Sequence, residues 1–232
     1  FKKHYNSIMV RGKKIIAISR FIKDHIQSTY GVDENRIRLI RRGIDLDRFD
    51  PAKVRVERVV QLAAKWRLPD GVPVVMLPGR MTRWKGQTMM IEALARLGRH
   101  DICCLLVGSD QWRTGYRMEL EALIRQRGLS DMVHVVEHCV DMPAAYMMAD
   151  VVVSASTDPE AFGRVAVEAQ AMGRPVIAPD HGGARETLRP GKTGWLFLPG
   201  NAEALAEVLG RVLELNPTER EILTKTAINY AV

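Results

Sequence analysis

Two glutamates and two cations are the side chains in this sequence best suited to chemistry. Glu160 and Glu168 are separated by seven residues, and Arg80 lies five residues before Lys85 in a short loop. A guanidinium offers a planar fork and an ammonium a mobile point charge, so this pair suits a diphosphate. Ionised carboxylates only accept hydrogen bonds, which suits the hydroxyl groups of a sugar. The alternative is that Arg80, Lys85 and Glu168 are solvated surface charges.

A predicted helix start separates the two glutamates. The peptide N–H groups of Phe162, Gly163, Arg164 and Val165 would lack helical partners there, and such groups suit an anion. Gly163 allows a close backbone approach. The helix that follows is apolar on nearly every side, so a carboxylate at position 168 needs a partner.

A third polar loop runs from Pro179 to Glu186. Gly182 and Gly183 leave its backbone free to approach a ligand. We interpret Arg185 and Glu186 as structural residues and His181 as a solvated loop histidine, with acid–base chemistry as the alternative for the histidine. A Walker loop and a Gly-x-Gly-x-x-Gly fingerprint are both absent from the sequence.

The elements that must position these loops are alternating strands and helices. Strands are predicted over Lys14–Ser19, Ile37–Ile40, Val74–Leu77, Cys103–Val107, Val133–Val136, Val151–Ser154, Val176–Ala178 and Trp195–Leu198. The clearest helices are Gly86–Leu97, Gly115–Arg127, Ala202–Leu215 with Asn201 as N-cap, and Thr218–Val232. Most strands are continuous apolar runs, which indicates an α/β fold: a Rossmann-like parallel sheet with helices on both faces. Ligands of such sheets bind beyond the carboxyl ends of the strands.

A polar, turn-rich stretch near residues 41–56 predicts a boundary. We expect residues 1–50 to comprise the end of a preceding segment with a linker, and residues 51–232 to form a full α/β domain. The absence of an initiator Met and a final helix without a cap indicate a part of a longer protein.

Composition narrows the class of protein. Apolar residues make up 47% and charged residues 26%, which is ordinary for a globular domain. Cys103, Cys104 and Cys139 show no metal-ligand spacing and are predicted to be buried free thiols in a reducing cytoplasm. The first 67 residues carry 17 Lys and Arg against 7 Asp and Glu. A basic surface of this kind suits anionic lipid, nucleic acid or an acidic partner domain, but no nucleic-acid-binding motif accompanies it.

Several motifs together resemble the retaining family 4 glycosyltransferases, whose two-domain architecture is the GT-B fold. They are Arg80-x4-Lys85-Gly86, Glu160-x7-Glu168, Gly182-Gly183-x-x-Glu186 and Gly191-x-x-Gly194. Ile16-Ala-Ile-Ser19, followed by Arg42-Gly-Ile-Asp-Leu-Asp-Arg-Phe49, is similar to the segment that links the two domains of that family. The resemblance implies that this chain is the C-terminal, donor-binding half.

The resemblance also implies roles for individual residues. Arg80 and Lys85 would stabilise the departing nucleoside diphosphate, and Glu160 would bind hydroxyl groups of the transferred sugar. Phe162, Gly163, Arg164 and Val165 would offer backbone N–H groups, and Glu168 would bind the ribose. Backbone near Val136 and Glu137 would meet the base. The donor would be a UDP-, GDP- or ADP-sugar, and neither a metal nor a further cofactor is required.

The chain departs from the family pattern at two places. Arg42 stands where the family usually has Asn, and Val136-Glu-His-Cys139 stands where it usually has Phe-x-Gly. The base contact therefore follows the family least closely. The resemblance further implies a missing N-terminal acceptor domain, so that this chain alone would transfer sugar poorly or not at all.

The resulting hypothesis is a cytoplasmic hexosyltransferase that retains anomeric configuration. It would act in lipopolysaccharide or other surface-glycan synthesis, with the inner face of the membrane as a further partner and without nucleic acid. One alternative is a non-catalytic basic module that binds anionic membrane or nucleic acid. Another is a phosphorylase or a sugar-nucleotide epimerase of the same fold. The sequence leaves the base, sugar, acceptor and oligomeric state open.

Overall fold

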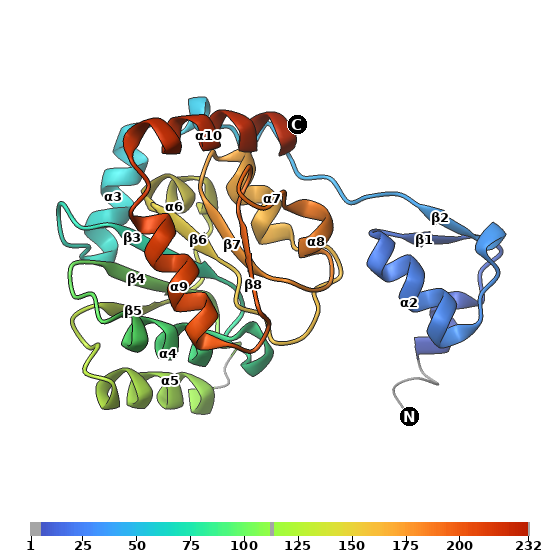
Figure 1. The fold of residues 1–232 in the computed structure, drawn as a ribbon, viewed down its shortest axis with the longest axis horizontal. Coiled ribbons are helices and arrows are strands. Elements are labelled where there is room, and N and C mark those ends of the chain that lie inside the picture. The colour runs from blue at the N-terminus through green and yellow to red at the C-terminus, as the bar shows by residue number, and fades with distance from the viewer. Residues whose placement is uncertain (1–5, 112–113, 232) are drawn as a thin grey trace.

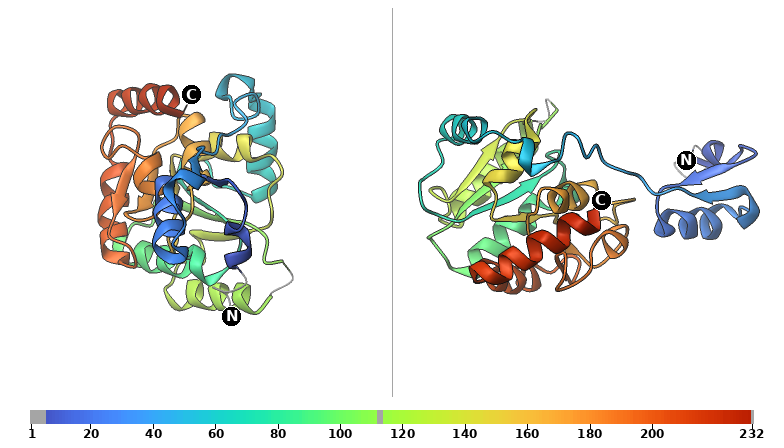
Figure 2. Two further views of the ribbon diagram at one scale, coloured as in Figure 1. Left: turned by 90° about the vertical axis from the view of Figure 1, so that its right-hand side faces the viewer. Right: turned by 90° about the horizontal axis from the view of Figure 1, so that it is seen from above.

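The computed structural model describes residues 6–111 and 114–231 of the chain. They form two parallel sheets that an extended segment joins (Figure 1; Figure 2). The smaller sheet pairs β1 (Ile15–Ala17) with β2 (Ile37–Leu39), and α2 (Arg20–Tyr30) connects the two strands. A short 3-10 turn, η1 (Ser7–Val10), precedes β1, and another, η2 (Glu34–Arg36), precedes β2.

The larger sheet has six parallel strands in the order β5-β4-β3-β6-β7-β8. Its strands are β3 (Val74–Pro78), β4 (Cys103–Val107), β5 (Val133–Val136), β6 (Val151–Val153), β7 (Val176–Pro179) and β8 (Trp195–Phe197). All eight predicted strands are present, and those at 103–107 and 133–136 agree at both ends. The prediction of an α/β fold with a parallel, Rossmann-like sheet is confirmed.

Helices cover both faces of the six-stranded sheet (Figure 1). One face carries α4 (Gln87–Leu97), α5 (Thr114–Gln126) and α9 (Ala202–Leu213). The other carries α3 (Val56–Trp66), α6 (Met142–Met148), α7 (Arg164–Ala171) and α10 (Pro217–Ala231). The remaining elements are α8 (Ala184–Thr187) and the 3-10 turns η3 (Pro51–Lys53) and η4 (Arg83–Lys85).

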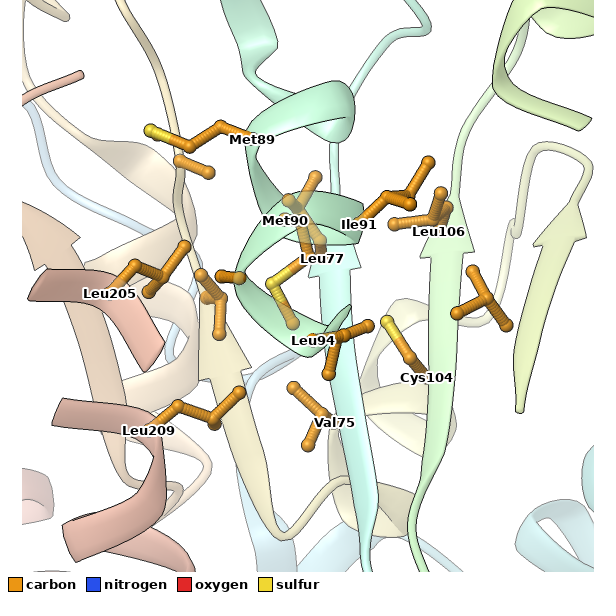
Figure 3. Close-up of a cluster of buried hydrophobic side chains, with 14 of the residues drawn as sticks. Val75, Leu77, Met89, Met90, Ile91, Leu94, Cys104, Leu106, Leu205 and Leu209 are labelled. Atoms are coloured by element: carbon orange, nitrogen blue, oxygen red, sulfur yellow. The ribbon is translucent and has the colours of Figure 1, made fainter. Parts of the chain in front are cut away.

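The continuous apolar strands fill two cores at once. Successive side chains of a strand point to opposite faces, so Val75 and Leu77 enter one core while Val74 and Met76 enter the other. Figure 3 shows the first core, where Leu94 of α4 and Leu209 of α9 meet the sheet. All five residues of β3 are buried, which explains why this run contains no polar residue.

Local signals in the sequence agree with the structure at several points. The Asn201 side chain accepts a hydrogen bond from the Ala204 N–H at 3.0 Å, which confirms the predicted N-cap of α9. The three cysteines are free and buried, and burial raises the pKa of the Cys103 thiol to about 11. Among the described residues, no helix is both long and apolar enough to cross a bilayer.

The strand order reverses at one point of the sheet, and we call the edge of the sheet at this switch point the crevice. From β3 the chain moves outward to β4 and β5, and it then returns to place β6 on the other side of β3. In doubly wound sheets ligands bind where the order reverses, beyond the carboxyl ends of the two central strands. The loops after β3 (residues 79–86) and β6 (residues 154–163) border that crevice.

Candidate functional site

Lys85 and Glu160 meet at this crevice although 75 residues separate them. The Lys85 Nζ lies 2.6 Å from Glu160 Oε1, and the two side chains are only 14% and 17% exposed. The Lys85 ammonium also lies 4.4 Å from the centroid of the Trp84 ring. A partly desolvated ion pair of this kind interacts more strongly than a solvated one. The interpretation of Lys85 as a solvated surface cation is therefore wrong.

The Glu160 carboxylate is held through one of its oxygens. Oε1 accepts hydrogen bonds from Lys85, from the Ser156 hydroxyl and, at 3.5 Å, from the Ser154 hydroxyl. In the described part of the chain, no hydrogen bond to Oε2 is recorded. This arrangement orients the carboxylate and leaves two lone pairs of Oε2 to accept hydrogen bonds from hydroxyl groups.

Glycines bring the loops of the crevice into direct contact. Gly86 has φ +72°, and a Cβ at this position would lie 1.8 Å from the Ala155 carbonyl oxygen. A Cβ on Gly183 would lie 2.5 Å from the Phe162 Cα, and the Gly183 N–H donates to the Glu160 carbonyl at 2.8 Å. The loops after β3, β6 and β7 therefore pack backbone to backbone, which only residues without a side chain permit.

Arg80 opens the same loop that ends in Lys85. Its side chain is exposed, and no described residue is recorded as its hydrogen-bond or ion-pair partner. Its backbone is held, because its carbonyl accepts from the Gln87 amide group at 2.9 Å. The structure thus brings Lys85 and Glu160 together and leaves the Arg80 guanidinium uncommitted within the described residues.

The predicted helix start lies three residues beyond Glu160. Gly163 caps α7 with φ +82°, and no side chain caps this end. Within the described chain, the N–H groups of Arg164 and Val165 have no recorded backbone partner. Phe162 is buried and Arg164 is exposed. The free N–H groups and the helix dipole favour an anion at this position.

Glu168 is buried inside α7, at 7% exposure, and it has the partner that its surroundings demand. The Tyr146 hydroxyl donates to Oε2 at 2.9 Å, and the Arg164 guanidinium lies 3.0 Å from Oε1. Burial raises the pKa of the Glu168 carboxyl above its ordinary value, although the Tyr146 hydrogen bond and the arginines lower it in part. The alternative of a solvated helix position is wrong.

A pocket of about 520 Å³ opens beside Glu168. Its lining combines the linker, the segment after β5 and the outer face of α7, and includes Arg42, Arg48, Phe49, His138, Cys139, Val140, Arg164 and Glu168. The sequence placed the base contact at Val136 and Glu137. That contact stays a prediction: Val136 lines a groove beside Trp66, while His138, Cys139 and Val140 of the same segment share the pocket with Glu168. Part of the basic charge of the N-terminal third thus faces this pocket.

The structure adds residues that sequence reasoning did not identify. Tyr146 lies in α6 and Ser156 follows β6, and each holds one of the glutamates. The demand of a buried carboxylate for a donor was readable from the sequence, but the identity of the donor was not.

His181 was interpreted as solvated, which is wrong: both ring nitrogens are buried and have no hydrogen-bond partner among the described residues. No group of three or more His, Cys, Asp or Glu residues that could hold a metal ion occurs in residues 6–111 and 114–231.

Replacement of Tyr146 by Phe tests how Glu168 is held. We expect the variant to fold, to lose about 1–2 kcal/mol of unfolding free energy because a buried acceptor loses its donor, and to raise the pKa of Glu168 further. The measurements are urea unfolding and a carboxyl titration followed by NMR. Tyr30→Phe is the control, because no hydrogen bond of its hydroxyl is recorded in the described residues. An unchanged Glu168 pKa in Tyr146→Phe would contradict the assignment.

Two models of known protein families together match nearly the whole chain. Residues 61–230 match the family model described as glycosyl transferases group 1, and residues 1–48 match the model described as glycosyltransferase family 4. A curated relative, the D-inositol 3-phosphate glycosyltransferase of Xylanimonas cellulosilytica, is 33% identical over 210 residues. The match covers 89% of this chain and 50% of the relative. The chain thus spans about half the length of the curated relatives it matches.

Solved structures show the same architecture. A glycosyltransferase from Rickettsia africae superposes with a TM-score of 0.92 at 38% identity, covering 100% of this chain and 61% of that one. HepE from Anabaena, crystallised with UDP and glucose, superposes with a TM-score of 0.90 at 26% identity, covering 100% and 62%.

Proposed function

The chain belongs to the glycosyl transferases group 1 family, and on that premise we propose that it forms the donor side of an enzyme that transfers a sugar from a nucleoside diphosphate to a hydroxyl group. The observation that carries the proposal is the meeting of Lys85 and Glu160 at the crevice of the sheet, 2.6 Å apart. A carboxylate for sugar hydroxyls and a cation for the diphosphate then lie side by side. The UDP and glucose bound to Anabaena HepE support this class of ligand.

Each residue of the site has a defined task in this proposal. As the bond between the sugar and the diphosphate breaks, negative charge grows on the leaving phosphate, and Lys85 and Arg80 stabilise it electrostatically. The N–H groups of Arg164 and Val165 add two fixed dipoles. Glu160 holds the sugar through its uncommitted oxygen, and Glu168 accepts hydrogen bonds from the ribose.

The acceptor, the stereochemistry and the cellular setting belong to the same proposal. We propose transfer with retention of configuration, onto an acceptor held by a partner domain, in surface-glycan synthesis at the cytoplasmic side of a membrane. The alternative of a purely electrostatic binding module accounts for less. Arg42 and Arg48 from the basic third line the pocket of Glu168 instead of forming a separate surface.

Calorimetry with UDP-glucose, GDP-mannose and ADP-glucose tests the proposal directly. We expect one of the three to bind with about micromolar affinity, because the site supplies several charge-assisted hydrogen bonds. Binding to anionic vesicles that no nucleotide sugar displaces would favour the electrostatic module. A folded sample that binds none of the three would refute the donor site.

Glu168→Gln separates the binding role of Glu168 from its cost in stability. Because burial raises the folded-state pKa above the ordinary value of about 4.3, the protonated group stabilises the fold at low pH, and this contribution is lost as pH rises through the raised pKa. Glutamine stays neutral, so at pH 7 we expect a higher Tm than in the wild type but about tenfold weaker nucleotide binding. Thermal unfolding from pH 4 to pH 8 checks the first expectation and calorimetry the second. A Tm advantage that is equally large at pH 4 and pH 8 would contradict this account.

A further inference from the structure

The N-terminal unit, residues 6–40, is seated on the sheet domain through the beginning of α2. The Glu186 carboxylate of α8 accepts hydrogen bonds from the Arg20 N–H at 2.9 Å and from the Phe21 N–H at 2.8 Å. The Ser19 hydroxyl donates to the Ala161 carbonyl at 2.5 Å. The N-terminal end of α2 faces α8 in Figure 1, so the two units meet where these bonds form.

These contacts and the Ser19 cap satisfy the first three N–H groups of the helix, those of Arg20, Phe21 and Ile22. The first turn of α2 contains no acidic residue of its own. Glu186, which is 165 residues from Phe21 in the sequence, supplies the missing negative charge. Its carboxylate interacts with two N–H groups that have no partner within the helix, and with the helix dipole. Ser19 is 1% exposed and also accepts from the Ile22 N–H at 3.1 Å, so its hydroxyl both donates and accepts.

The same contacts reach residues 160–163, the loop before α7 that we call the donor loop. Ala161 lies between Glu160 and Phe162, and the Gly183 N–H holds the neighbouring Glu160 carbonyl at 2.8 Å. Two consecutive carbonyl groups of this loop are thus fixed from outside, one by α2 and one by the segment that leads into α8. The Ser19 hydrogen bond to the Ala161 carbonyl therefore connects the beginning of α2 to the backbone next to Glu160.

We propose that Ser19 and Glu186 are positioning residues that couple the seating of the N-terminal unit to the order of the donor loop. This proposal rests on the function proposed above. Neither residue needs to touch the donor. When the donor orders residues 160–163, the Ala161 carbonyl becomes a better partner for Ser19. The coupling is reciprocal, so seating of α2 in turn favours donor binding.

Hydrogen exchange at single amides tests the proposal in the whole chain. Glu186→Ala and Ser19→Ala remove the contacts, Glu186→Gln keeps one acceptor oxygen, and Glu207→Ala on the exposed face of α9 is the control. Without nucleotide, we expect Glu186→Ala to raise exchange at residues 20–23 on the order of tenfold, with Glu186→Gln intermediate and Glu207→Ala unchanged. Equal exchange in Glu186→Ala and Glu207→Ala would overturn the proposal.

A second measurement separates coupling from simple structural support. UDP, GDP or ADP, whichever binds, is expected to slow exchange severalfold at residues 20–23 in the wild type. In Glu186→Ala the nucleotide should slow exchange only in α7, because the N–H groups of the first turn of α7 can still bind it. Nucleotide-dependent slowing at residues 20–23 that survives in Glu186→Ala would overturn the coupling. If none of the three nucleotides binds the wild type, the donor site itself is refuted together with the coupling, while the nucleotide-free comparison still decides whether Glu186 seats α2.

Discussion

Replacement of Lys85 by Ala is expected to weaken binding of the nucleotide sugar about a hundredfold. The side chain is the cation closest to Glu160 and is mostly removed from water, so its interaction with a diphosphate is charge-assisted and weakly screened. Losing one such contact costs about 1.5–3 kcal/mol, which is a factor of about ten to a hundred and fifty in Kd. Calorimetry with the donor identified in the screen gives the value.

The same replacement leaves the Glu160 carboxylate without its counter-ion, and this adds a loss of stability of about 2 kcal/mol. The double variant Lys85→Ala/Glu160→Gln removes the unpaired charge. It should regain most of the stability but none of the affinity, and a double-mutant cycle separates the two effects. Lys192→Ala, at an exposed lysine near β8, is the matched control. Equal affinities of Lys85→Ala and Lys192→Ala would contradict the proposed role.

Gly86→Ala is expected to cost about 4 kcal/mol of unfolding free energy. A Cβ at Gly86 would lie 1.8 Å from the carbonyl oxygen and 2.7 Å from the carbonyl carbon of Ala155, at a φ of +72°. An alanine here is strained in the left-handed backbone conformation, and its Cβ also forces two packed loops apart. The two costs add, because neither loop can move without disturbing Lys85 or Glu160. Chemical denaturation measures the loss, and calorimetry should show that donor binding falls with it.

Gly98→Ala isolates the steric part of this effect. Gly98 lies at the other end of α4 with a similar φ of +64°, and a Cβ added there would meet no atom within 4 Å. It should therefore show only the conformational cost of about 1–2 kcal/mol and leave donor binding unchanged. Similar losses in both variants would mean that contact with Ala155 does not hold the two loops together.

The glutamates of the motif have separate surroundings, and this difference matters for their chemistry. Glu160 lies beside a cation and two serine hydroxyls, whereas Glu168 lies beside a buried tyrosine at the edge of an open pocket. Burial at the second site raises the pKa of the Glu168 carboxyl and so opposes its ionised form. Seven intervening residues place Glu160 before α7 and Glu168 inside it.

The sequence by itself determined the local elements of this protein. An apolar run such as Cys103–Val107 has to be a strand covered on both faces, and Asn201 has to begin a helix, because each signal lies within a few consecutive residues. The need of Glu168 for a partner was equally local, since its own helix is apolar. The helix α6 has only seven residues, which are too few for its periodicity to identify it.

Only the tertiary structure decided which elements are neighbours. Nothing in the periodicity of β6 requires it to pair with β3 instead of β5, yet this pairing brings Lys85 to Glu160. The donation from Tyr146 to Glu168 and the seating of α2 on Glu186 depend on packing in the same way. Strand order follows from how whole helices and strands fill both cores, a property of the assembled chain that no short window of sequence contains.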